Sequence, residues 1–402
     1  MKASYRWVVL CVGLFAMTAG AAAAQGLASI TPALREYYGI ELGTIGVLLG
    51  AVSLGIVPAV LPWGLAADRW GERPVMALGM LSASAVLVLL AYQKDLVAVI
   101  VLLVLGGATS ASVNAASGRA VMQWFPAEGR GMAMAIRQTS SPLGAGLAAL
   151  ALPGIARAYG VPVVYLSLAG FCAAGAIAVL LFMRPAPHAR ATAVVHGPRP
   201  SVLLDRRLWV ICAVAGLLVV PQFALTALLV EYLHGRQGMT VAGAAVVLAV
   251  AQGSGAVARL VNGAWSDRVG DRLGPLAKIA GLTAVGCAAV AATGWAPLPV
   301  VVAVVVIAAT FAISWNGLAN LVAAELAGPE RAGAALGLEN TVAFLAAATT
   351  PPVLAIIIEH TSWPVGHTIP AALSAIACVL MAQLIRTTRR STAAGLQRRV
   401  AR

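Results

Sequence analysis

Twelve apolar segments, each long enough to cross a lipid bilayer as a helix, dominate this chain of 402 residues. A membrane-spanning helix needs about 20 predominantly apolar residues. Dividing the sequence at its polar clusters gives the segments 7–29, 43–63, 74–92, 97–121, 131–156, 161–183, 208–232, 241–265, 275–295, 298–325, 333–358 and 364–386. The sequence therefore predicts an all-α polytopic membrane protein with 12 transmembrane helices.

The composition excludes a soluble fold. Apolar residues make up 60% of the chain and charged residues only 10%, whereas soluble domains average about 25% charged residues. The formal charge of +13 fits the Lys- and Arg-rich cytoplasmic loops of membrane proteins, so we expect a lipid bilayer and no nucleic acid as partner. The five cysteines lie far apart within apolar segments, and enzyme, nucleotide and metal motifs are absent from the sequence. We expect no cofactor and no enzymatic activity.

The longest connection divides the chain into six segments and six. We expect an N-terminal bundle over 1–183, a cytoplasmic central loop over 184–207, a C-terminal bundle over 208–386 and a basic cytoplasmic tail over 387–402. Most basic residues fall on the side of the central loop, which predicts that both termini are cytoplasmic in a bacterial-type inner membrane. The first segment also resembles a cleavable signal peptide. We favour an uncleaved helix, because cleavage would leave eleven spans.

The two halves of the chain repeat one another. Residues 64–73 read GLAADRWGER, and residues 263–272 read GAWSDRVGDR, so that the glycines, the Asp-Arg pair and the last arginine match at one constant offset. Residues 131–139 similarly resemble 333–341, and Asn114 corresponds to Asn316. A duplicated unit of six helices accounts for this repeat.

These features resemble the major facilitator superfamily, whose signature between the second and third helices is G-x-L-x-D-R-x-G-R-[RK]. Residues 64–73 follow it closely, with Glu72 in the ninth place, and the resemblance extends over essentially the whole chain. It implies two pseudo-symmetric six-helix bundles around a central cavity, with substrate bound near the membrane midplane and alternating access by rocking.

The Asp-Arg segments are predicted to act as a conformational latch. A carboxylate at a helix end can accept hydrogen bonds from the N–H groups of a nearby helix N-terminus, and the family resemblance implies a gating role instead of a substrate site. The alternative is a plain solvated turn. The predicted gating residues are Asp68, Arg69, Arg73, Asp267, Arg268 and Arg119, the last of which could instead extend its charged end to the membrane surface.

Arg259 is the strongest candidate for substrate binding. It shares one helical face with other polar side chains of the eighth span, and a guanidinium can bind a carboxylate in a bidentate fork. An arginine in this helix also resembles the substrate-binding arginine of the oxalate/formate antiporter and the monocarboxylate transporters. The alternative for Arg259 is gating through a salt bridge between the bundles.

Glu339 is the best candidate for proton coupling, and Glu325 is the second. Ionisable side chains inside membrane spans are costly and usually functional. Glu339 occupies the place in the eleventh span that Arg137 has in the fifth. The alternatives are a fixed salt bridge for Glu339 and simple solvation for Glu325. No histidine is expected inside a span, so His367 is predicted to lie in a loop.

The predicted substrate site combines the deep arginines with neutral polar residues from several spans. Trp315 lies well inside a span, where its ring could form a pocket wall or pack between helices. The set is Arg259, Arg137, Gln25, Asn114, Gln222, Gln252, Trp315 and Asn316. Because two deep arginines face few buried acids, the cavity favours anions.

We therefore expect a monomeric secondary transporter of a small organic anion, a carboxylate, with proton symport as an option. The alternative is a proton-driven exporter of drugs or metabolites. A third hypothesis is a transporter-like receptor that does not translocate.

Overall fold

The computed structural model describes residues 2–125, 127–185, 204–328 and 331–400. Within these ranges the chain is helical and contains no β-strand. Twelve helical stretches are long and apolar enough to cross a membrane, which confirms the number of spans predicted from the sequence. Most of the predicted central loop, 186–203, lies outside the described residues.

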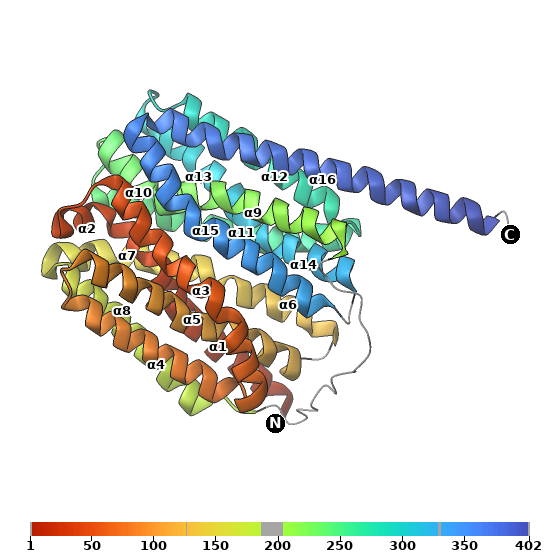
Figure 1. Ribbon diagram of the computed structural model, residues 1–402, viewed down its shortest axis with the longest axis horizontal. Coiled ribbons are helices and arrows are strands. Elements are labelled where there is room, and N and C mark those ends of the chain that lie inside the picture. The colour runs from red at the N-terminus through yellow and green to blue at the C-terminus, as the bar shows by residue number, and fades with distance from the viewer. Residues whose placement is uncertain (1, 126, 186–203, 329–330, 401–402) are drawn as a thin grey trace.

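The first six spans form one bundle, coloured red to yellow-green in Figure 1. A single cluster of buried apolar side chains, from Val9 to Met183 with the addition of Ala227, forms its core. Its elements are α1 (Lys2–Gln25), the 3₁₀ helix η1 (Gly26–Ile30), α2 (Thr31–Tyr38), α3 (Leu42–Trp70), α4 (Glu72–Ala91), α5 (Leu96–Trp124), α6 (Ala127–Gln138), α7 (Ser140–Tyr159) and α8 (Val161–Phe182).

The last six spans form the second bundle, coloured green to blue in Figure 1. Two apolar clusters pack its core, one around Trp315 and one around Leu248. Its elements are α9 (Arg206–Ala227), α10 (Leu229–Glu231), the π-helix η3 (Tyr232–Arg236), α11 (Val241–Val269), α12 (Leu273–Ala292), α13 (Leu298–Ser314), α14 (Asn316–Ala327), α15 (Ala332–His360) and α16 (Trp363–Val400). The last helix continues well beyond the predicted span and projects from the bundle (Figure 1).

Several spans are broken where the sequence predicts one continuous helix. The fifth span breaks between α6 and α7. Pro142 explains this break, because its nitrogen carries no hydrogen and cannot bond the carbonyl of Gln138 four residues earlier. Pro32 similarly lies in the first turn of α2. The tenth span breaks at Trp315, where the sequence has no neighbouring proline.

We name the two ends of the molecule by their residues. The motif end carries the repeated segments 64–73 and 263–272, and the far end carries the start of α3 and the end of α15. At the far end α3 packs closely on α15, because Gly43, Gly46 and Gly50 leave room for the opposite helix. A Cβ atom at Gly46 would stand 2.5 Å from the carbonyl oxygen of Pro351.

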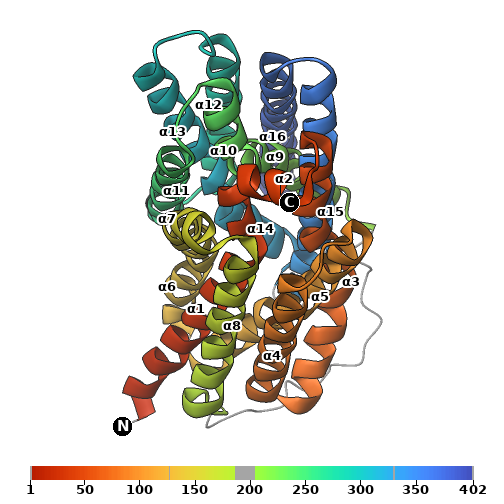
Figure 2. The same cartoon turned by 90° about the vertical axis from the view of Figure 1, so that its left-hand side faces the viewer.

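An apolar cluster extends this contact between the bundles at the far end. It consists of Leu42 from the first bundle with Ala224, Leu228, Leu354, Ala355 and Ile358 from the second. Figure 2 views the molecule from the far end, with α2 and α10 near the centre where the two bundles meet. The far end is therefore closed by direct packing of one bundle on the other.

Candidate functional site

Arg259 connects the two bundles. It extends from α11 of the second bundle, where its Nε donates to the carbonyl oxygen of Ile313 at 2.8 Å. Its Nη1 donates to the carbonyl oxygen of Gln138 in the first bundle at 3.0 Å. That carbonyl is the one that Pro142 leaves without a helical partner. The broken helix therefore supplies an acceptor that Arg259 reaches from across the interface.

Arg137 is held inside the first bundle. Its side chain is buried, and its Nε donates to the hydroxyl of Ser117 at 2.9 Å. Its Nη2 donates to the carbonyl and side-chain oxygens of Asn114, at 2.6 and 2.8 Å. Gly118 leaves space for the guanidinium, which lies 3.6 Å from where a Cβ atom would stand. Two predicted site residues, Arg137 and Asn114, are thus in direct contact.

Arg259 at the bundle interface and Arg137 inside the first bundle bring two positive charges close together in the chain's fold. Arg259 bonds the residue that follows Arg137 in the chain. Among the described residues, neither arginine forms an ion pair with a carboxylate, and every hydrogen bond that they donate goes to a neutral oxygen. A region of this kind attracts an anion.

The other predicted substrate residues divide between the interface and the interior of a bundle. Gln25 donates to the Ser141 hydroxyl at 2.8 Å, and buried Gln252 faces Gly146 across the contact of α11 with α7. Trp315 is fully buried in the core of the second bundle and donates to Gln222 at 3.1 Å. In this conformation the Trp315 ring packs between helices. Asn316 accepts from Asn320, also in the second bundle, at 3.3 Å.

The two candidate proton carriers differ in their surroundings. Glu339 is fully buried in α15, and within the described part of the chain neither of its carboxylate oxygens has a hydrogen-bond partner. The salt bridge that the sequence allows for Glu339 is not formed there. Glu325 is half-exposed at the motif end, where it pairs with Arg272 at 3.4 Å.

At the motif end, the charged contacts stay inside each bundle. Arg119 pairs with Asp68 and, through Nε, with Glu72 at 2.9 Å. Asp68 therefore binds an arginine of its own bundle, whereas the sequence predicts a bond from a helix N-terminus.

The second copy of the motif is similarly arranged. Arg272 pairs with Asp267 and Glu325 and donates to Ser266 at 2.7 Å. In the first copy Arg73 donates to the carbonyl of Leu180 in α8. Arg69 and Arg268 are exposed.

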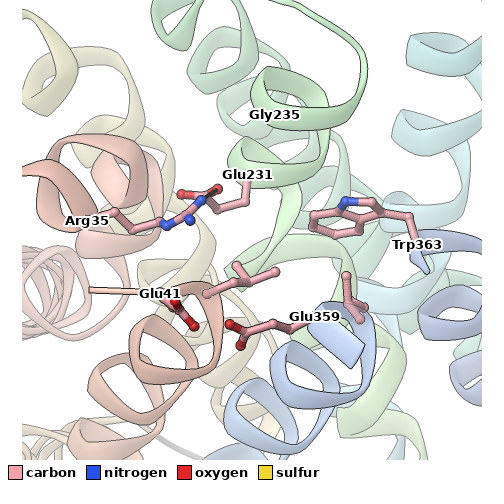
Figure 3. Close-up of a pocket in the computed structure, with 8 residues that line it drawn as sticks. Arg35, Glu41, Glu231, Gly235, Glu359 and Trp363 are labelled. Atoms are coloured by element: carbon pink, nitrogen blue, oxygen red, sulfur yellow. Dashed lines mark hydrogen bonds and ion pairs between the residues drawn. The ribbon is translucent and has the colours of Figure 1, made fainter. Parts of the chain in front are cut away.

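The far end carries a charged cavity that the sequence does not reveal. Its volume is about 440 Å³. It borders the apolar contact of the bundles, and its charged lining residues come from both of them (Figure 3). The lining residues are Arg35, Glu41, Leu42, Glu231, Gly235, Ile358, Glu359 and Trp363. Glu231 falls within the predicted span 208–232. A carboxylate inside a predicted span is the one sequence signal that could have identified this residue as a functional candidate.

The prediction that His367 lies in a loop is wrong. It lies in α16, inside the last membrane span and not in a loop. Its ring is buried against Tyr232, with ring centres 4.9 Å apart, and stacks on Trp363. The aromatic neighbours let the ring pack in this apolar environment.

Comparison with known proteins agrees with this architecture. The family model described as Major Facilitator Superfamily matches residues 8–351. The chain belongs to the major facilitator superfamily. Two relatives from Mycobacterium tuberculosis, the uncharacterized MFS-type transporters MT3072 (strain CDC 1551 / Oshkosh) and Rv2994 (strain ATCC 25618 / H37Rv), are each 33% identical over 360 residues, which are 89% of this chain and 81% of theirs. The protein is thus a membrane transporter, as the sequence predicts.

Solved structures of the superfamily share the fold at low sequence identity. A bacterial homolog of the human lysosomal transporter Spinster, in an inward-facing and occupied conformation, aligns with a TM-score of 0.79 at 15% identity and covers 95% of this chain and 97% of its own. The nucleoside transporter NupG (D323A mutant) aligns at 0.74 and 13% identity, covering 94% and 99%. The human organic anion transporter MFSD10 (TETRAN) aligns at 0.72 and 18%, with the same coverage.

Proposed function

We propose that this superfamily transporter moves a small organic anion, in particular a carboxylate, across a bacterial inner membrane with both termini in the cytoplasm. The observation that carries the proposal is Arg259, a guanidinium at the interface of the bundles whose bonds go to two backbone carbonyls. A carboxylate offers the same donors a bidentate, charge-assisted partner. The substrate therefore replaces neutral acceptors with a charged one.

Arg137 supplies positive charge without moving. Its three hydrogen bonds to Ser117 and Asn114 fix the guanidinium inside the first bundle. We assign it the role of raising the local positive potential, while Arg259 makes the direct contact. Gln252 lies at the contact of α11 with α7, and Gln25 bonds Ser141 of α7, so both are available to offer neutral polar groups to the rest of the substrate.

The test is uptake of a panel of mono- and dicarboxylates into proteoliposomes by Arg259→Lys and Arg259→Gln variants, with a thermal-shift measurement of ligand binding. Lysine keeps the charge but loses the fork, so uptake by Arg259→Lys falls at least about tenfold, which corresponds to about 1.4 kcal/mol. Arg157→Lys, at an exposed arginine of α7, is the control and transports normally.

Near-normal uptake by Arg259→Lys, with unchanged selectivity, would contradict the proposal. A loss of transport with unchanged ligand binding would assign Arg259 to gating instead. The direction of net flux against an imposed pH gradient separates uptake from the alternative, proton-driven export.

We propose in addition that Glu339 carries the coupled proton. Its carboxylate oxygens are buried without hydrogen-bond partners in the described part of the chain, and an ionised carboxylate in such a place is costly unless it is paired. Glu339→Gln removes the titratable group and should abolish acid-stimulated transport while leaving substrate exchange intact. An unchanged pH dependence of transport would reject this role.

A further inference from the structure

The far-end cavity holds charged groups from both bundles. Arg35 and Glu41 come from the first bundle, and Glu231 and Glu359 come from the second. Arg35 Nη1 and Glu231 Oε2 form an ion pair at 3.2 Å. The cavity lies at the end of the molecule opposite the Asp-Arg motifs, so it is separate from the gating and substrate residues considered above.

Two carboxyl groups meet inside this cavity. Figure 3 shows the side chains of Glu41 and Glu359 directed toward each other. Glu359 is fixed by the backbone N–H of Gly43, which donates to its Oε2 at 2.8 Å. A side chain at position 43 would prevent this approach, because a Cβ atom would lie 2.7 Å from the same oxygen.

A hydrogen bond between two carboxyl groups requires a proton on one of them, because an ionised carboxylate only accepts. The bond that Glu359 accepts from Gly43 favours its ionised form, so a proton held between the two groups resides on Glu41. The hydrogen bond to Glu359 and the negative charge of Glu359 raise the pKa of Glu41 above its ordinary value. Both carboxyl groups are exposed to solvent, so the proton exchanges from the far side.

The other charges around the pair come from three elements. Arg35 in α2 and His360 at the end of α15 act on the pKa of Glu41 in the opposite direction, more weakly than Glu359 does. Glu231 in α10 engages Arg35 through one oxygen, while its other oxygen is buried without a partner in the described part of the chain. No group of three or more His, Cys, Asp or Glu side chains suited to a metal ion occurs among the residues described.

We propose that Glu41 and Glu359 form a proton-binding site that exists only while the far end is closed. The two groups lie on opposite bundles, so separating the bundles there separates the pair. Closing the far end then favours proton uptake by the pair, and opening it favours release of that proton to the far side. This site goes beyond the anion and Glu339 proposals, since it places a coupled proton at a gate.

The sign of the pH dependence follows from linkage. Glu41 binds its proton more tightly in the closed state, so protonation stabilises closure. This stabilisation is fully present below the pKa that Glu41 has in the open state, and it is lost as the pH rises through the raised pKa of the closed state. Acid therefore favours a closed far end, and alkali favours an open one.

The experiment measures the distance between the bundles at the far end. Spin labels are attached at Tyr92 and Trp295, exposed residues in far-end loops of the first and second bundles, after replacement of both by cysteine in a Cys11→Ser background. Distance distributions are recorded by double electron–electron resonance, without substrate, from acidic to alkaline pH. The wild-type distribution should shift from short to long distances as the pH rises.

Substitutions at position 41 decide the outcome. Glu41→Gln keeps a neutral donor toward Glu359, so the short distance should persist at every pH. Glu41→Ala removes the donor, so the long-distance component should be present even in acid. Glu36→Gln, at an exposed carboxylate of the preceding helix α2, is the control and should behave as wild type.

A wild-type pH response in Glu41→Gln would overturn the proposal, as would a wild-type distribution that does not change with pH. Because no substrate is present, these results do not depend on the anion or on Arg259. Failure of the proton site and failure of the proposed function are therefore separable.

Discussion

The two ends of this transporter contain similar charged residues that are connected in opposite ways. At the far end, Arg35 pairs with Glu231 and Gly43 bonds Glu359, and both contacts join one bundle to the other. At the motif end, the ion pairs of Arg119 and of Arg272 each stay within one bundle. Of these contacts, only those at the far end connect one bundle to the other.

The same comparison separates two mechanical tasks. Contacts within a bundle keep its helices together while the bundle moves as a unit, and contacts between bundles stabilise one of the two end states. In the described conformation the ion pairs of the repeated Asp-Arg segments are of the first kind, and the far-end contacts are of the second kind. Substitutions at the two ends should therefore change different measurements.

The largest effect is expected from Gly50→Val at the far end. A Cβ atom at Gly50 would collide with the carbonyl oxygen of Ala348 and lie 3.1 Å from Pro352. Overpacking of this kind costs about 1–3 kcal/mol, which lowers the closed population roughly five- to hundredfold and reduces transport. Far-end spin-label distances and proteoliposome uptake measure both effects. Gly64→Val, on the same helix with no neighbouring atom within 4 Å, is the control; equal losses in the two variants would contradict the close packing at Gly50.

Arg119→Ala should lower stability without opening the far end. It leaves Glu72, whose side chain is largely buried, without its cation, and a buried charged group that loses its partner costs about 2 kcal/mol. Thermal unfolding in detergent should show a lower midpoint, while the far-end distance stays at its wild-type value. A longer far-end distance in this variant would remove the distinction between the two ends.

Arg35→Ala should have a smaller effect, confined to the far end. The arginine side chain is 41% exposed, so solvent screens the ion pair and its loss weakens closure by about 1 kcal/mol. Adding Glu231→Gln removes the buried charge that Arg35 leaves behind and should recover part of the closed population. The double variant and both single variants form a double-mutant cycle. If Glu231→Gln recovers none of the closed population, the result would contradict the ion pair between Arg35 and Glu231.

Arg272→Ala is expected to have the smallest effect. Its partners Asp267 and Glu325 are exposed, so their ion pairs contribute less than about 1 kcal/mol. The decrease in unfolding midpoint should be smaller than for Arg119→Ala and should shrink further in high salt. A decrease as large as that of Arg119→Ala would show that the two copies of the motif are equivalent in stability.

The transmembrane spans and their division into two related bundles could be predicted, because both can be read directly from patterns in the sequence. Apolar runs determine which segments cross the membrane, and the repeat of residues 64–73 at 263–272 relates the halves. The helix breaks inside the fifth and tenth spans are harder to predict from the sequence. Pro142 is a visible cause of one, but the break at Trp315 has no comparable local cause, and packing in the second bundle surrounds it.

The far-end contacts could not be predicted, because they depend on which helix ends meet. Glu359 lies one residue beyond its predicted span, and Glu41 lies in a short connection, so neither appears exceptional in the sequence. The surroundings of Trp315, a predicted substrate-site residue, could not be predicted from the sequence either. An aromatic residue deep in a span is compatible with a cavity wall or with helix packing, and only the fold places it in the core.

The bond from Arg259 to the carbonyl that Pro142 frees has a consequence for the unloaded carrier. An arginine without a counter-ion in a membrane interior carries a large desolvation cost, but the carbonyls of Gln138 and Ile313 offset part of it. Because the bond to Gln138 joins the two bundles, it also stabilises the described end state of the empty carrier, and reorientation without substrate must break it. Reorientation while empty is the step that permits net accumulation, whereas a carrier that lacks it performs only one-for-one exchange.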